Sequence, residues 1–301
     1  MNGYLNILKP AGMSSAAVVA AVRRMTGEKR VGHAGTLDPE AAGVLPVMTG
    51  KATRLFDFLV DKEKEYVAVA AFGASTDTQD ATGTVLETGE NYPSLELIRE
   101  KAQCLIGDIR QVPSMYSAIK VGGRPLYSLA RKGIQAEVPI RTVHIARIDV
   151  LREMPDHGAE LRVACGRGTY IRTLCHDLGA LCGCPAHMRS LLRTRSGVFT
   201  LETALPLEEA KSLAAEGKLA ERMLPPDYPL AHMKRIDASP RLGKWVQNGT
   251  KLPLDSVAGD IPAEGEAARI YLKGQFWGIV RRSGESLLWQ AQIAPEEEKE
   301  K

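Results

Sequence analysis

The spacing of apolar positions along the chain predicts short strands interspersed with amphipathic helices. Four strands are expected before residue 170, at residues 5–8, 65–72, 143–151 and 160–165. Helices are expected where apolar residues recur with helical period, from a cap at Ser14 or Ser15 to Gly27, over 94–107 and over 169–182. Residues 75–83, rich in Thr, Asp and Gly, predict a loop. Because the elements form no regular βαβ units, the pattern predicts an α+β fold with a mixed, largely antiparallel sheet flanked by helices.

A second domain is predicted after the Pro-Pro-Asp-Tyr-Pro run at residues 225–229. Short strand candidates follow at 268–272, 276–281 and 287–293, separated by Gly-containing turns, as in a small β-barrel. The predicted organisation is therefore a main domain over residues 1–229, a small β domain over 230–294 and a charged tail over 295–301.

The bulk composition is that of an ordinary globular protein. The 301 residues are 44% hydrophobic and 25% charged, enough to bury a core in one large domain and a smaller one. No apolar run approaches the roughly 18 residues of a membrane span. The N-terminus lacks the basic and long apolar regions of a signal peptide, so a cytoplasmic protein without membrane contact is expected.

The cysteines predict neither a disulfide framework nor a metal site. There are five, an odd number that suits a reducing compartment. Cys182 and Cys184, near His187, have one residue between them, whereas paired cysteine ligands of structural zinc have about two to four. We therefore expect small buried side chains here and no bound metal.

Net charge is only +3, but two segments are strongly basic. Residues 162–195 contain six arginines and one acid, and residues 110–147 contain seven Lys or Arg and one acid. Such segments are typical of surfaces that face phosphate, which indicates a nucleic-acid partner. The alternative is a solvated face balanced by acids elsewhere.

The candidate chemistry centres on Asp38, a lone carboxylate in the turn Gly-His-Ala-Gly-Thr-Leu-Asp-Pro at residues 32–39. An apolar run follows it up to residue 47. A fixed turn that presents one acid beside a buried element is typical of a nucleophile or a general base. The alternative is an Asp chosen for its turn chemistry before Pro39.

This stretch, residues 32–47, resembles the catalytic signature of the TruB family of tRNA pseudouridine synthases. Further segments resemble the other family motifs in order, from about Leu5 to Phe199: residues 9–15, 64–66, 111–120, 123–131, 166–174 and 192–197. In the segment 9–15, Ser14 stands where the family usually has Thr, and in the segment 166–174, Arg167 stands where the family usually has Lys. The resemblance implies a pseudouridine synthase fold, an RNA-gripping insertion at about 109–140 and a PUA-like RNA-binding barrel at the C-terminus.

The resemblance also implies a function. Family members convert uridine 55 in the T-loop of tRNA to pseudouridine by breaking the N1–C1′ bond, turning the uracil and joining C5 to C1′. Nothing is oxidised, so no cofactor is expected, and the expected partner is the T-loop and T-stem of tRNA bound by a monomer. Two alternatives remain: the catalytic subunit of guide-RNA-directed pseudouridylation, and a non-catalytic tRNA-folding module.

Roles for individual residues follow from the same resemblance. It implies that Asp38 is the essential catalytic residue and that Arg172 pairs with it. It implies that Tyr66 stacks on the flipped uracil, since an aromatic face replaces lost base stacking. His33 is expected to assist base flipping, with Tyr170 and Leu192 in substrate binding. The basic side chains expected at phosphates are Lys9, Lys120, Arg131 and Arg193.

Overall fold

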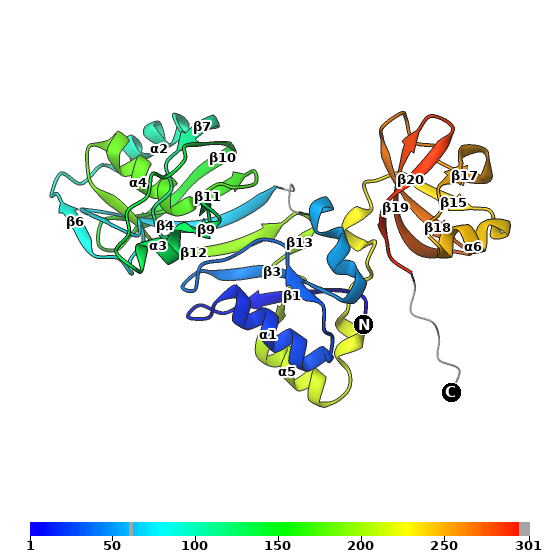
Figure 1. Ribbon diagram of the computed structural model, residues 1–301. Helices are drawn as coiled ribbons and strands as arrows, with labels where there is room; N and C mark the ends of the chain where they lie inside the picture. The colour runs from blue at the N-terminus through cyan, green and yellow to red at the C-terminus, as the bar shows by residue number, and fades with distance from the viewer. Residues whose placement is uncertain (60–62, 295–301) are drawn as a thin grey trace. The chain divides into compact units, whose positions relative to one another are not determined.

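The structure is a computed structural model that describes residues 1–59 and 63–294 (Figure 1). By its internal contacts the chain divides into two units. Unit 1 comprises Met1–Asp38, Val44–Val60 and Gly197–Lys301, and unit 2 comprises Pro39–Gly43 and Asp61–Ser196. The predicted charged tail at 295–301 lies outside the described residues.

Unit 1 begins with a small sheet and its helices. Its strands are β1 (Gly3–Lys9), β2 (Val31–His33), β3 (Ala42–Thr49), β13 (Phe199–Thr200) and β14 (Leu205–Pro206). Its helical segments are α1 (Ser15–Thr26), α5 (Leu207–Ala215) and the 3-10 helices η1 (Gly50–Phe58), η2 (Leu219–Arg222) and η3 (Tyr228–Leu230). β1 lies between β14 and β3 and runs parallel to β14, and β2 is antiparallel to β3.

The sheet of unit 1 is buried on both faces. On one face, Leu5 and Ile7 of β1 pack with Leu45 and Val47 of β3 against α1 and α5. On the other face, Tyr4, Val44 and Met48 pack against η1 and the C-terminal sheet. A strand buried on both sides needs apolar residues at successive positions, which explains why the run after Asp38 shows no alternation.

Unit 2 is built on an antiparallel sheet in the order β12-β4-β11-β10-β7. Its strands are β4 (Lys64–Phe72), β5 (Ala74–Thr76), β6 (Val85–Thr88), β7 (Gly107–Gln111), β8 (Lys120–Val121), β9 (Arg124–Pro125), β10 (Arg141–Met154), β11 (Gly158–Cys165) and β12 (Ala186–Ser196). Its helices are α2 (Leu95–Gln103), α3 (Leu126–Ala130) and α4 (Ile171–Cys182). α4 packs on β12 and β4 and α2 on β10, so both cover this sheet (Figure 1).

The predicted α+β class with a mixed, largely antiparallel sheet is confirmed. Several element boundaries were wrong by a few residues, and in two cases a predicted helix or loop overlaps a strand. The helix expected over 94–107 ends at Gln103, and Gly107 already begins β7, which its positive φ allows. The loop expected over 75–83 starts inside β5, because Ser75 and Thr76 pair with β6.

The C-terminal region forms a second sheet, with strands at the three predicted places. Among the described residues its order is β16-β20-β19-β18-β15-β17. The strands are β15 (Arg235–Ala238), β16 (Leu252–Pro253), β17 (Val257–Gly259), β18 (Ala267–Leu272), β19 (Gln275–Ser283) and β20 (Ser286–Gln292). The helical turns are η4 (Pro240–Leu242), α6 (Gly243–Gln247) and η5 (Leu254–Ser256). One face encloses a core that includes Ile236, Val246, Ile270 and Leu287.

The other face of the C-terminal sheet shares a core with the N-terminal part of unit 1. Ile279 and Ala291 belong to the same apolar cluster as Tyr4 and Leu55. Arg54 also donates from Nη1 to the Gln292 carbonyl oxygen at 2.8 Å. The domain boundaries inferred from the sequence stay a prediction, and removal of the C-terminal sheet is expected to expose part of this shared core.

No helix within residues 1–59 and 63–294 is both long and apolar enough to span a bilayer.

Replacing Ile279 with Ala tests the shared core. Because Ile279 is fully buried, the change should lower the free energy of unfolding by about 2–5 kcal/mol. Urea denaturation followed by circular dichroism measures it. Leu288, also in the C-terminal sheet but 41% exposed, is the matched control and should lose less than about 0.5 kcal/mol on replacement with Ala. Equal losses in both variants would contradict the shared core.

Candidate functional site

The segment that carries Asp38 leaves β2 and returns in β3. His33 is the last residue of β2 and pairs with Val47 of β3, and the Ala34 N–H donates to the Pro46 carbonyl at 3.0 Å. Beyond this point the regular strand pairing stops. Asp38 is the last residue of the first segment of unit 1, and Pro39 directly follows it at the start of a segment of unit 2.

In unit 2 the start of β3 lies against β12, which in turn lies against β4. Ala42 is in register with Leu192, and Gly43 with Arg193. On the other side of β12, Arg193 is in register with Tyr66 of β4. The structure therefore brings the expected site residues Tyr66, Leu192 and Arg193 onto neighbouring strands, beside the segment that follows Asp38.

Gly43 is required where β3 meets β12. A Cβ at this position would lie 2.2 Å from the Arg193 carbonyl oxygen and 2.6 Å from the Arg193 nitrogen. Its φ of +118° also excludes most L-residues. The glycine permits the close main-chain approach that holds this register.

Arg172 lies in the first turn of α4 and is only 6% exposed. Its guanidinium donates to the Thr78 carbonyl at 3.0 Å, the Tyr116 carbonyl at 3.0 Å and Asp80 Oδ2 at 3.4 Å. A buried guanidinium needs such partners because desolvation of the charge is otherwise very unfavourable. The pairing of Arg172 with Asp38 stays a prediction.

Asp80 is a residue that the sequence interpretation left inside a plain loop. Its Oδ1 accepts hydrogen bonds from the Thr78 and Thr82 hydroxyls and from the Thr82 N–H, at 2.8, 2.6 and 2.9 Å. Its Oδ2 faces Arg172. The carboxylate therefore organises its own loop and orients the arginine. The spacing Thr-Asp-Thr-x-Asp at residues 76–80 is typical of such local loop hydrogen bonds, but it does not indicate the contact with Arg172.

Tyr170, expected in substrate binding, is fixed through its main chain. The fully buried Gln111 accepts from the Tyr170 N–H at 3.0 Å and donates from Nε2 to the Tyr170 carbonyl at 3.2 Å. Gln111 is the last residue of β7 and lies near the start of the predicted RNA-gripping insertion at about 109–140. The first part of the predicted insertion is thus bound to the start of α4 at two points: Gln111 binds Tyr170, and the Tyr116 carbonyl accepts from Arg172.

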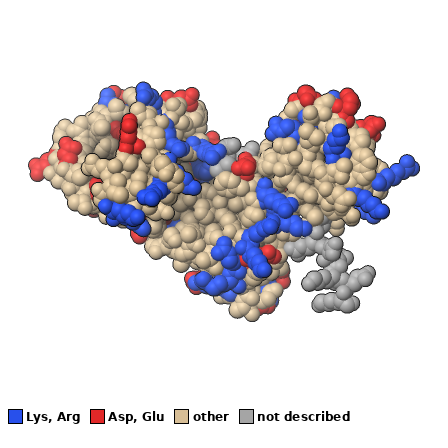
Figure 2. Space-filling model, viewed as in Figure 1, with Lys and Arg blue, Asp and Glu red and all other residues tan. Residues whose placement is uncertain are grey.

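The basic residues expected at phosphates divide into two classes. Lys120 and Arg131 are exposed, and the Arg131 guanidinium lies 5.6 Å from the centre of the Tyr127 ring. Lys9 is 0% exposed and Arg193 is 1% exposed. Their contact with phosphate stays a prediction, and their burial argues against it. Figure 2 shows Lys and Arg spread over the visible face rather than gathered in one field, in keeping with the small net charge.

The arginine-rich segment 162–195 is not a uniform phosphate-facing surface. Arg172 is buried, Arg189 donates to the carbonyls of Pro155 and Asp156, and Arg195 pairs with Glu63. The phosphate-facing surface predicted for this segment therefore does not extend to Arg172, which was predicted to pair with Asp38 and whose guanidinium forms hydrogen bonds inside the protein.

The cysteine cluster has the small buried side chains that were expected. Cys175, Cys182 and Cys184 are buried free thiols. Burial raises the pKa of Cys182 to about 11. Within the described residues, no three His, Cys, Asp or Glu side chains are grouped so that they could hold a metal ion.

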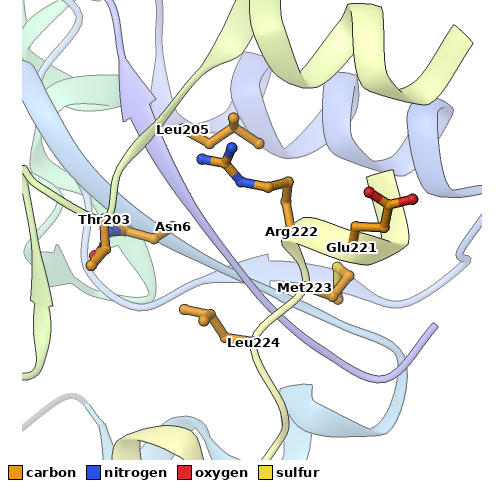
Figure 3. A pocket seen from close by; sticks show the side chains of 7 residues that line it. All are labelled: Asn6, Thr203, Leu205, Glu221, Arg222, Met223 and Leu224. Atoms are coloured by element: carbon orange, nitrogen blue, oxygen red, sulfur yellow. Dashed lines mark hydrogen bonds between the residues drawn. The ribbon is translucent and has the colours of Figure 1, made fainter. Parts of the chain in front are cut away.

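A cavity of about 240 Å³ in unit 1 lies apart from the predicted site residues (Figure 3). Its lining is Asn6, Thr203, Leu205, Glu221, Arg222, Met223 and Leu224. Asn6 donates to Thr203 and to the Thr200 carbonyl, which joins β1 to the segment before β14. None of the residues predicted to take part in catalysis or RNA binding lines this cavity.

Comparisons with known proteins assign most of the chain. The family model for "TruB family pseudouridylate synthase (N terminal domain)" matches residues 23–171. The model for "tRNA pseudouridylate synthase B C-terminal domain" matches residues 172–231. The tRNA pseudouridine synthase B of Alkaliphilus oremlandii is 43% identical over 284 residues, covering 93% of this chain and 94% of the relative. That of Symbiobacterium thermophilum is 46% identical over 252 residues, covering 83% and 82%.

Solved structures agree on the fold. A chain from the structure of an H/ACA RNP bound to a substrate RNA containing 2'-deoxyuridine superposes with a TM-score of 0.72 at 25% identity, covering 98% of this chain and 86% of that one. A chain from a Cbf5-Nop10-Gar1 complex gives a TM-score of 0.72 at 26% identity, covering 97% and 84%.

Replacing Gly43 with Ala tests the close approach of β3 to β12. The added Cβ meets main-chain atoms of Arg193, which have no room to move, so the free energy of unfolding should fall by about 3 kcal/mol or more. Gly122→Ala is the control, because Gly122 also has positive φ but open space around it. If thermal denaturation gives the same loss for both, backbone strain alone explains the effect.

Replacing Asp80 with Asn tests the role of this carboxylate. The amide puts a donor or a neutral oxygen against Arg172, so the free energy of unfolding should fall by about 2 kcal/mol, as for a lost hydrogen bond to a charged group. Differential scanning calorimetry measures the change. Asp57→Asn, at an exposed position of η1, should have almost no effect. An unchanged free energy of unfolding for Asp80→Asn would mean that the contact between Asp80 and Arg172 does not stabilise the protein.

Proposed function

This chain belongs to the TruB family of pseudouridylate synthases, and we propose that its substrate is transfer RNA, in which it converts uridine 55 of the T-loop to pseudouridine. The observation that carries the proposal is the similarity to relatives named tRNA pseudouridine synthase B at 40–46% identity over most of both chains. The position within tRNA rests on the motif resemblance.

The reaction is an isomerisation that needs one well-placed carboxylate. The N1–C1′ bond breaks, the uracil turns, C5 bonds to C1′, and the proton on C5 is lost while N1 gains one. Asp38 begins this sequence either as a nucleophile or as a base that removes a ribose proton. Both roles require the ionised form of Asp38, which a nearby guanidinium favours. Arg172 is our candidate for that guanidinium.

The neighbouring residues hold and turn the base in this proposal. Tyr66 offers an aromatic face to the flipped uracil, and its alignment with Arg193 and Gly43 supports a place beside the Asp38 segment. Leu192, in register with Ala42, and Tyr170, at the start of α4, complete the apolar surroundings of the base. His33 assists the flipping.

The exposed basic residues of the insertion bind the RNA backbone in this proposal. Lys120 and Arg131 are carried forward because a phosphate contact needs a solvent-facing cation. Lys9 and Arg193 are not carried forward in this role, since both are buried. Tyr127, 40% exposed beside Arg131, supplies an aromatic surface of the kind that RNA-binding proteins use. The C-terminal sheet is proposed to add a second, PUA-like RNA contact.

Two alternatives are less well supported. The solved structures with H/ACA names are 25–26% identical, whereas the tRNA synthase relatives reach 40–46%. The first test is therefore to incubate the purified chain with an unmodified tRNA transcript and no guide RNA, and to map pseudouridine by mass. A tRNA-folding module without catalysis would leave the transcript unmodified. A monomeric, cytoplasmic protein remains our prediction.

Asp38→Asn should abolish turnover while tRNA binding is largely kept. The amide preserves shape but is neither a nucleophile nor a base, so the rate should fall by several orders of magnitude. Single-turnover pseudouridine formation measures it, and filter binding measures the affinity. Glu40→Gln, an exposed acid two positions away, is the control and should keep full activity. A rate above about a tenth of wild type for Asp38→Asn would refute the catalytic assignment.

The affinity for tRNA should fall steeply with salt, because bound phosphates release counterions. Lys120→Ala and Arg131→Ala should each reduce the slope of log K against log[salt] by up to about one if the residue contacts phosphate. Lys218→Ala is the control, since Lys218 is exposed but paired with Glu216 and outside the insertion. An unchanged slope would place the tested residue on the solvated surface.

A further inference from the structure

Ser15 makes an unusual pair of contacts with the segment that carries Asp38. Its Oγ donates to the Leu37 carbonyl oxygen and accepts from the Leu37 N–H, each at 2.9 Å. Ser15 is 2% exposed and Leu37 is 3% exposed. One hydroxyl therefore satisfies both main-chain groups of the residue that directly precedes Asp38.

The helix itself does not need this hydroxyl. Ser14 is the N-cap of α1, and its side chain accepts from the Ala17 N–H at 3.1 Å. Ser15 is the first residue within the helix, where its side chain is not used for capping. The two adjacent serines therefore have separate tasks: Ser14 begins the helix, and Ser15 binds the loop.

The hydroxyl sits on a rigid support. Val18 and Val22 of α1 are fully buried in the core cluster that includes Leu45 of β3. Leu37, by contrast, lies in a segment with no regular secondary structure. Because both hydrogen bonds end on its main chain, they restrict the peptide planes on either side of Leu37, and the second of these planes leads into Asp38.

The chain is restricted on the far side of Asp38 as well. Pro39 disfavours helical backbone at Asp38, the residue before it. The carboxylate therefore projects from a backbone that is constrained from both directions, by Ser15 through Leu37 and by the proline ring. A displacement of about 1 Å at a reacting group lowers rates by about 100-fold.

We propose that Ser15 is a positioning residue, which sets the Leu37–Asp38 backbone so that the Asp38 carboxylate meets the target nucleotide correctly. This inference rests on the proposed function. It gives a physical task to the Ser-Ser pair that ends the first motif, at residues 14 and 15.

The test compares Ser15→Ala with Ser14→Ala on an unmodified tRNA transcript. Single-turnover rates are measured with saturating enzyme, so that an inactive fraction does not change the rate constant. Ser15→Ala should slow the chemical step by about 10- to 100-fold while KM stays within about twofold. Ser14→Ala, which loses the cap of the same helix, should be thermally less stable and keep the wild-type rate. Ser15→Thr, which retains the hydroxyl, should recover most of the rate.

A wild-type rate for Ser15→Ala, or equal slowing by both alanine variants, would overturn the positioning role. If Ser15→Ala does not fold, Ser15→Cys replaces it, because the thiol has similar size but is a weak hydrogen-bonding group. The rate for Ser15→Cys should then lie well below that of wild type. If wild-type protein forms no pseudouridine in the transcript, the proposed function fails instead, and this result is separate from any difference between the serine variants.

Discussion

The close main-chain approach of Gly43 to Arg193 is the constraint on which the rest of the site depends. It is possible only because Gly43 has no Cβ, which would meet the Arg193 carbonyl at 2.2 Å. Arg193 in turn is in register with Tyr66, so Gly43, Arg193 and Tyr66 lie at one level across three neighbouring strands of unit 2. Asp38 precedes Gly43 by only a few residues of chain, two of them conformationally restricted around Pro39. The pairing of β3 with β12 therefore limits the positions that Asp38, the candidate catalytic residue, can take.

Buried polar side chains replace strand pairing where the functional segments leave the sheets. Main-chain N–H and C=O groups removed from water need partners, and a turn that has left its sheet has no neighbouring strand to supply them. Ser15 binds both main-chain groups of Leu37, and Gln111 binds both main-chain groups of Tyr170. In both cases the side chain is remote in sequence, by 22 and 59 positions. The turns can therefore hold non-regular conformations without losing their hydrogen bonds.

Sequence patterns predicted the elements whose signals are local. Helix α1 begins at its Ser14 cap and ends before Gly27 in the left-handed conformation, as local capping chemistry requires. Strand β12 was missed because three arginines interrupt its apolar pattern, yet its alternate side chains are buried and the strand lies between β3 and β4. This segment forms a strand because it pairs with β3 and β4, which are remote in sequence. No local signal reveals that Asp80 faces Arg172, which is 92 positions away.

Sequence alone also does not show which basic side chains are exposed, so the net charge of +3 does not measure how many cations an RNA would meet. A basic segment in a sequence does not distinguish an arginine that faces phosphate from one that binds protein groups. Arg172 is paired with Asp80 and Arg195 with Glu63, and a cation paired with a carboxylate adds little to the field that an approaching RNA meets. Lys120 and Arg131 remain solvent-facing. How strongly the protein attracts RNA therefore depends on which basic side chains are exposed and not paired with carboxylates, rather than on the total number of basic residues.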